Sequence, residues 1–233
     1  AIVYWKQDSI VQHFISTAND DFKGRIALAE SHIAPFANFP YISVDLEDFE
    51  VFETKESEVP LVHLEDLYLG FDFWTLISGK FDISMIRLDN GYIHTYQDEN
   101  GEFDIMHAFE PTHPIEDVEE EFHFNLEEIS LNNISIDKSN ADSLVILALI
   151  DQSEIKVSNE PEDLFLGVDL ATHLSIIDQG DTTFFNNKEI LLETTVDYKK
   201  KNEVIALSES TLDVMNSKFA VDGSIDFKND MDI

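Results

Sequence analysis

The chain has 233 residues, of which 14 are Lys or Arg and 48 are Asp or Glu, so its formal net charge at pH 7 is −34. This charge repels nucleic acids and anionic membrane surfaces, and it argues against nucleic acid as a partner. The chain has no Cys, which excludes disulfides and thiolate metal sites, while a hydrophobic fraction of 43% with 18 Phe indicates a folded protein.

The chain opens with AIVYWK, residues 1–6, a short apolar stretch that ends in Trp and Lys. Both residue types are common at membrane interfaces, so the stretch is either the outer end of a membrane anchor or a strand. No run of eighteen apolar residues occurs in the given sequence, so these residues alone do not span a bilayer.

Residues 8–22 predict an amphipathic helix. Ile10, Phe14 and Ala18 recur every four residues, and an Asp or Ser at its start is a suitable cap. A second, short helical turn is predicted near residues 73–79, where Gly79 ends the segment FWTLISGK.

Most of the remaining chain has strand patterns, separated by Pro, Asn-Gly and Ser-Asn turn signals. The last four predicted strands are joined by short polar turns, which favours antiparallel pairing. The predicted strands are residues 24–33, 41–53, 60–73, 81–96, 120–136, 142–150, 163–177, 189–198, 203–208, 210–215 and 218–227.

A Pro-rich acidic segment, residues 110–121, divides the chain into residues 1–109 and 122–233. It carries two of the six prolines and a run of acids, so it is either a connection between two regions or a long surface loop. The first region then holds the helix and the first strands, and the second holds a continuing series of strands, which either forms one continuous groove with the first region or stands apart from it.

Several strands change phase half-way along. In VDLEDFEVFE the apolar residues Val44 and Leu46 share one parity and Phe49 and Val51 share the other, and similar slips recur in residues 62–71 and 124–133. A bulge adds one residue and keeps both halves of a strand facing the same way, whereas the alternative is that each slip marks the end of a strand. Bulges repeated in neighbouring strands predict a strongly curled sheet.

If the slips are bulges, one set of apolar side chains faces one side of the sheet, while Asp45, Glu47, Glu50, Glu65 and Glu127 coat the other. A second sheet would cover the apolar side in a sandwich, and a curled trough would leave it for a non-protein ligand. The apolar set is Val44, Leu46, Phe49, Val51, Leu64, Leu67, Leu69, Phe71, Ile86, Leu88, Leu126, Ile129 and Leu131.

No motif for catalysis, a metal or a cofactor is found. The eight His lack the paired spacing of zinc motifs on one element, and with 48 acids any carboxylate pair can arise by chance. The sequence also has no phosphate loop, dinucleotide fingerprint or nucleophile elbow. We therefore expect no catalytic residue, no metal site, no cofactor and no enzymatic activity.

The arrangement of residues 8–106 resembles the N-terminal region of AsmA-like proteins. The segment LGFDFWTLISGKFDISMIRLDNGYIHTYQDENGEFD, residues 69–104, carries most of this resemblance, with a strand, a short helix, a strand and an Asp-x-x-Gly close. The family often has Asn at the position of Asp104. Residues 124–136 and 198–233 are similar to the repeats that follow in Bacteroidetes-type members.

The resemblance implies a mainly β protein with a strongly curled antiparallel sheet that forms a taco-like groove. It implies a periplasmic protein, held in the inner membrane by an N-terminal anchor missing from this sequence, that shields or conducts acyl lipids during outer-membrane biogenesis. Phospholipid or another acyl lipid is the expected ligand of the apolar set, and envelope proteins are expected partners. The alternative is a non-catalytic β-sandwich that serves as a scaffold or adhesin without a ligand.

Overall fold

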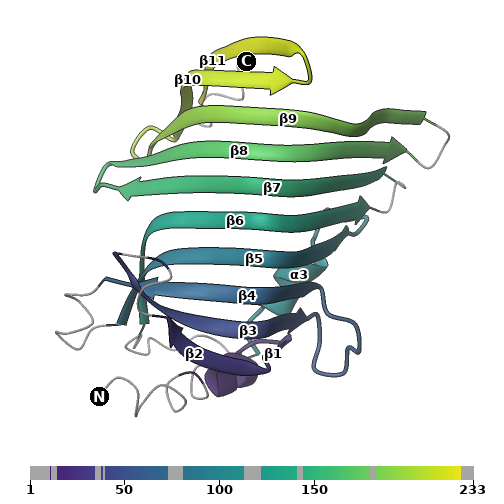
Figure 1. Cartoon of the computed structure of the whole chain (residues 1–233), viewed down its shortest axis with the longest axis vertical. Coiled ribbons are helices and arrows are strands. Elements are labelled where there is room, and N and C mark those ends of the chain that lie inside the picture. Colours follow the sequence, from purple (N-terminus) through teal and green to yellow (C-terminus); the bar gives the residue numbers. More distant parts are fainter. Residues whose placement is uncertain are drawn as a thin grey trace.

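A single sheet organises the chain. The computed structural model describes residues 11, 15–34, 38, 40–72, 81–112, 122–140, 144–178 and 182–226. Its strands form one 11-stranded sheet in the order β1-β3-β4-β5-β6-β7-β8-β9-β10-β11, with β2 also paired to β3 (Figure 1). The prediction of a mainly β protein is confirmed, and all the described strands lie in this one sheet, which leaves no second sheet of a sandwich among them.

The strands lengthen along the chain and shorten again at its end. Their bounds are Arg25–Ala27 (β1), Glu30–Ala34 (β2), Ile42–Phe52 (β3), Val62–Phe71 (β4), Phe81–Gln97 (β5), Phe122–Asn140 (β6), Leu144–Asn159 (β7), Asp163–Asp178 (β8), Thr182–Lys199 (β9), Val204–Val214 (β10) and Ser217–Asp226 (β11). Residues 15–21 are helical, within the predicted N-terminal helix, and α3 spans Asp104–Ala108. The predicted helical turn at 73–79 and the opening residues 1–6 lie outside the described residues.

One pair of strands departs from the predicted antiparallel order. β5 and β6 are parallel, and every other pair among the described strands is antiparallel. A parallel pair needs a crossover of a dozen or more residues, and here the chain between Gln97 and Phe122 includes α3. The predicted connection 110–121 belongs to this crossover, and the strands before and after it join the same sheet.

All three predicted phase slips lie inside continuous strands, and those in β3 and β4 line up with each other, whereas the one between Leu126 and Ile129 in β6 lies at a separate shift of the β5–β6 register. The β3–β4 ladder passes from Glu47–Asp66 to Phe49–Leu64, which leaves Asp48 and Glu65 out together. The same gap continues through Asn90 in β5, Asn133 in β6 and Asp151 in β7. The alternative that the slips end the strands is therefore wrong.

Shared slips also explain why the sheet is not strongly curled, contrary to the prediction. A bulge bends a sheet because one strand gains a residue that its neighbour lacks. From β3 to β7 each strand gains its residue at the same row, and the register is unchanged on both sides of the row. A true shift appears at this row only where β7 meets β8, between Ile150 and Gln152.

Left-handed backbone marks this row. Asp48 (φ 49°), Asn90 (φ 52°) and Asn133 (φ 52°) all have positive φ, which Asn and Asp tolerate better than most residues. The Asn133 side-chain amide donates a hydrogen bond of 2.8 Å to Asn90 Oδ1, so two neighbouring slips are tied to each other. A similar bulge at Glu209 (φ 52°) keeps residues 204–214 as one strand, where two were predicted.

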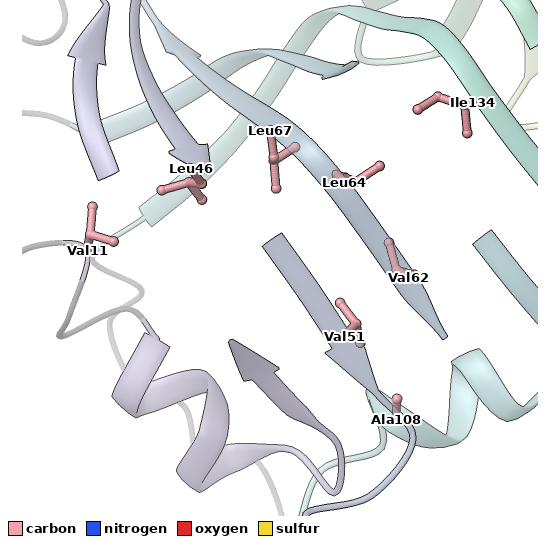
Figure 2. Packing of buried hydrophobic residues seen from close by; sticks show 8 residues of the cluster. All are labelled: Val11, Leu46, Val51, Val62, Leu64, Leu67, Ala108 and Ile134. Atoms are coloured by element: carbon pink, nitrogen blue, oxygen red, sulfur yellow. The ribbon is translucent and has the colours of Figure 1, made fainter. Parts of the chain in front are cut away.

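The buried core lies at the N-terminal end of the sheet. Figure 2 shows side chains from the N-terminal helix, β3, β4, α3 and β6 gathered on one side of the sheet. The cluster is Val11, Leu46, Val51, Val62, Leu64, Leu67, Ala108 and Ile134. The two helices thus cover the apolar face of the first strands.

The N-terminal helix is tied to the sheet by hydrogen bonds at its C-terminal end. The Asn19 amide accepts from Ile26 N at 2.7 Å and donates to Ile26 O at 2.9 Å. Gly24 N donates to Ala108 O at 2.8 Å, and a Cβ on Gly24 would lie 2.7 Å from Phe52 O. This close approach of three backbone segments fixes the helix and α3 over the same end of the sheet.

Candidate functional site

The strand register places the predicted apolar residues on one face. Val44, Leu69, Ile86 and Ile129 are opposite one another across four strands. Leu46, Leu67, Leu88 and Leu131 form the next row, and the same face continues past the slip through Phe49 with Leu64 and through Val51, while Phe71 extends it beyond Leu69. Leu126 is the exception, because it lies where the β5–β6 ladder jumps from Ile83–Phe124 to Met85–Glu128.

Several of the residues predicted to contact lipid are instead core residues. Leu46 is 2% exposed, and Val51, Leu64, Leu67 and Phe71 are also buried. Val11 belongs to the same buried cluster, and Ile15 and Ile105 pack against it. Leu46, Val51, Leu64 and Leu67 belong to this cluster and hold the helices on the sheet, and at all five positions burial leaves a ligand no access to the side chain.

The apolar face does not stop where this core stops. Each row continues across the sheet; for example, Leu131 is followed by Ser153, Leu170, Leu192, Leu212 and Phe219. We call the β7–β11 part of this face the open apolar face. Its apolar side chains are Ile146, Ala148, Ile150, Ile155, Val157, Leu164, Leu166, Val168, Leu170, Leu174, Ile176, Ile190, Leu192, Val196, Ile205, Leu207, Leu212, Val214, Phe219, Val221 and Ile225.

Burial changes sharply between the two parts of the face. Among the described residues, no apolar side chain after Ile134 is buried, and Phe219 at the far edge is 50% exposed. The described helices contribute their apolar side chains to the cluster that ends at Ile150. The open apolar face is therefore a broad apolar surface without a protein layer among the described residues.

Small hydroxyl residues are set into the open apolar face. Ser153, Thr172, Thr194 and Ser210 are buried between larger neighbours. Thr172 Oγ1 donates to Leu149 O at 2.9 Å, and the hydroxyls of Thr194 and Ser210 hydrogen-bond each other. Because these hydroxyl groups already have hydrogen-bond partners within the protein, the side chains of Thr172, Thr194 and Ser210 add little polarity to the surface.

The opposite face carries a polar network at its N-terminal end. Arg87 binds Asp89 through two nitrogens and donates to Asn38 Oδ1 at 3.0 Å, while Asn132 donates to Asp89 Oδ1 at 2.6 Å. Asp45 lies in the same row as Arg87, with Tyr68 between them. The predicted acidic coat is therefore partly a structured network rather than a freely solvated surface.

Asp45 is the unusual member of that network, because it is only 4% exposed. Burial, followed by the charge of Asp66, raises its pKa from 3.8 to about 6, against the lowering effects of His32 and of a hydrogen bond from Tyr68. Its Oδ1 atom has no hydrogen-bond partner. The sequence pattern assigned Asp45 to the outer face correctly but gave no sign of this burial.

Asp45, Glu47 and His32 form a group that we did not predict. Within the described residues it is the one set of three or more His, Asp or Glu side chains close enough to share a metal ion. No pattern within one strand indicates this group, because it combines His32 of β2 with two residues of β3. The group could have been found by aligning the predicted strand 24–33 antiparallel to the predicted strand 41–53, in the register that places His32 opposite Asp45.

Comparison with known proteins gives no match to a protein family or to a curated protein. The resemblance to AsmA-like proteins therefore stays a prediction. None of the helices in the described part of the chain has the length and apolar character to cross a membrane.

Proposed function

We propose that the protein binds the acyl chains of lipids on the open apolar face and shields them from water. The observation that supports this most directly is the end of the buried core at Ile134, five strands before the apolar face itself ends at β11. Large uncovered apolar patches are rare on soluble proteins and commonly serve as interaction surfaces. The proposed function is binding alone, with no catalysed reaction.

The size of the surface suits an acyl chain. Neighbouring strands lie about 4.8 Å apart, so β7 to β11 spans about 19 Å. β11, with 10 residues, is the shortest of these strands, which gives about 30 Å along the strand direction. Burying one CH₂ contributes about 0.8 kcal/mol, so ten of them contribute about 8 kcal/mol before the cost of lost motion is subtracted.

Charge favours the acyl part of a lipid as the group that is bound. The chain carries −34, and an acyl chain has no charge for that field to repel. Acidic side chains such as Asp169, Glu193 and Asp213 are on the opposite face of the same strands, in rows offset by one residue from Leu170, Leu192 and Leu212. The bound chain thus lies away from the acids.

Two adjacent residues of β9 allow a matched test. Leu192 pairs with Leu170 and Leu212 on the open apolar face, whereas Leu191 pairs with Ala171 and Asp213 on the opposite face and is 43% exposed. We expect Leu192→Asp to abolish binding of a fluorescent long-chain phospholipid, and Leu191→Asp to leave it unchanged. Circular dichroism of both variants checks that the sheet is intact.

Lipid binding that is absent from the wild type, or reduced equally by both folded variants, would contradict the proposal. Mass spectrometry of protein incubated with a bacterial lipid extract identifies the bound class. The family resemblance adds a proposed location in the periplasm at the inner membrane, with a role in outer-membrane biogenesis. Cell fractionation of the full-length protein tests that part separately.

A further inference from the structure

The register of β2 against β3 creates a three-ligand group at the edge of the sheet. His32 is opposite Asp45, and Glu47 is two residues further along β3, so all three side chains share the polar face. His32 Nε2 lies 3.1 Å from Asp45 Oδ2, and Nδ1 lies 3.3 Å from Glu47 Oε1. One ligand atom from each residue lies within 4.8 Å of the other two.

Asp45 gives this group a feature that a solvated cluster of acids lacks. Its side chain is 6% exposed, and its Oδ1 atom has no hydrogen-bond partner. An oxygen that is buried without a donor is costly, and a bound cation is one way to satisfy it. Glu47 and Asp66 both add negative charge near Asp45, which leaves the site short of positive charge.

We propose that His32, Asp45 and Glu47 bind a divalent transition-metal ion, with Zn²⁺ as the best match. One imidazole nitrogen and two carboxylates are ordinary zinc ligands, at about 2.0–2.2 Å from the ion. The His32 and Glu47 side chains are 51% and 41% exposed, so the ion can enter from solvent and both side chains have room to adjust. A solvent molecule completes the coordination.

The imidazole separates this site from general binding of cations by acids. Calcium and magnesium prefer oxygen ligands, and the surface acids of a chain with charge −34 attract both weakly. A nitrogen ligand favours zinc and cobalt over these ions. Bound metal would also join β2 to β3, the strand that β2 pairs with in the sheet.

A second histidine on the same face is the matched control. His63 in β4 has its Nδ1 atom 3.7 Å from Glu50 Oε1, and no third ligand completes a group around it among the described residues. Titration calorimetry of the whole protein with Zn²⁺ at pH 7 measures affinity. Co²⁺ absorption in the visible range reports whether an imidazole and carboxylates hold the ion.

We expect one saturable Zn²⁺ site in the wild type and in His63→Ala. Affinity should fall at least about tenfold in His32→Ala, because even groups outside the coordination shell contribute that much to metal binding. A nitrogen-detected NMR spectrum of the wild-type imidazoles at one equivalent of Zn²⁺ needs no variant, and His32 alone should shift. Equal affinity in His32→Ala and wild type, or an unchanged His32 signal, would overturn the proposal.

Discussion

Asp45→Asn removes a buried negative charge that the fold holds at a cost. The folded protein raises the pKa of Asp45 from 3.8 to about 6. Between these two pH values the folded state keeps a proton that the unfolded chain has released. Stability therefore falls as pH rises through this window, and the full cost is present above pH 6. Below about pH 4 both states are protonated and the cost disappears.

The size of the effect follows from the shift. A change of about two pKa units at 1.36 kcal/mol each gives about 3 kcal/mol above pH 6. The Asp45 side chain is 6% exposed, so solvent screening removes little of this. About half of this cost, roughly 1.5 kcal/mol, develops between pH 5 and pH 8, a range that lies above the isoelectric point of about 4.2.

Urea denaturation of wild type and Asp45→Asn, followed by circular dichroism without added metal, measures the effect at each pH. We expect the difference in the free energy of unfolding, variant minus wild type, to increase by roughly 1.5 kcal/mol from pH 5 to pH 8. Asp169→Asn is the control, because Asp169 is an exposed residue in the same row of the same face. A difference between wild type and Asp45→Asn that does not change with pH would refute the reasoning.

Three further predictions concern the sheet. Gly91→Ala should lower the free energy of unfolding by about 3 kcal/mol, because a Cβ at this position would lie 2.1 Å from His63 O. Gly223→Ala is the control and should change the free energy of unfolding little, since a Cβ there would have no atom within 4 Å. The midpoints of urea denaturation compare the two variants with wild type. In the same assay, Asn90→Ala should be less stable than Asn90→Gly by about 1 kcal/mol. Both variants lose the hydrogen bond from Asn133, but only Ala is strained by the positive φ of 52° at this position. Added NaCl should raise the thermal midpoint by screening the charge of −34; a midpoint that falls would contradict this.

Local alternation was enough to predict the two faces of the sheet. Val44 and Leu46 share a parity, Phe49 and Val51 share the other, and the register confirms that all four face the same way. The prediction succeeds because successive side chains of a strand point to opposite faces, so residues that share a face recur at every second position. The bounds of β3 and β4 followed for the same reason, since both lie within their predicted ranges. Other bounds were wrong: β7 continues to Asn159 where 150 was predicted, β9 begins at Thr182 where 189 was predicted, and the single strand predicted at 24–33 is divided into β1 and β2.

Pairing between distant segments was not predictable in the same way. The parallel β5–β6 pair depends on where residues 98–121 lead the chain, and a run of acids and prolines does not specify that direction. The group of His32, Asp45 and Glu47 depends on which residues of two strands lie opposite each other. One step of register would place His32 opposite Leu46 or Val44, on the apolar face, so no pattern within one strand predicts the group.

The open apolar face and the weak curl of the sheet have related causes. A strongly curled sheet would bring β11 back toward β3 and close the apolar side on itself. The slips at Asp48, Glu65, Asn90 and Asn133 are instead shared between neighbouring strands and leave the register between them unchanged. The apolar rows therefore run straight out from under the two helices. Under the proposed function the cover over β7–β11 is hydrocarbon, which lies on apolar side chains without bringing backbone polar groups that need hydrogen-bonding partners.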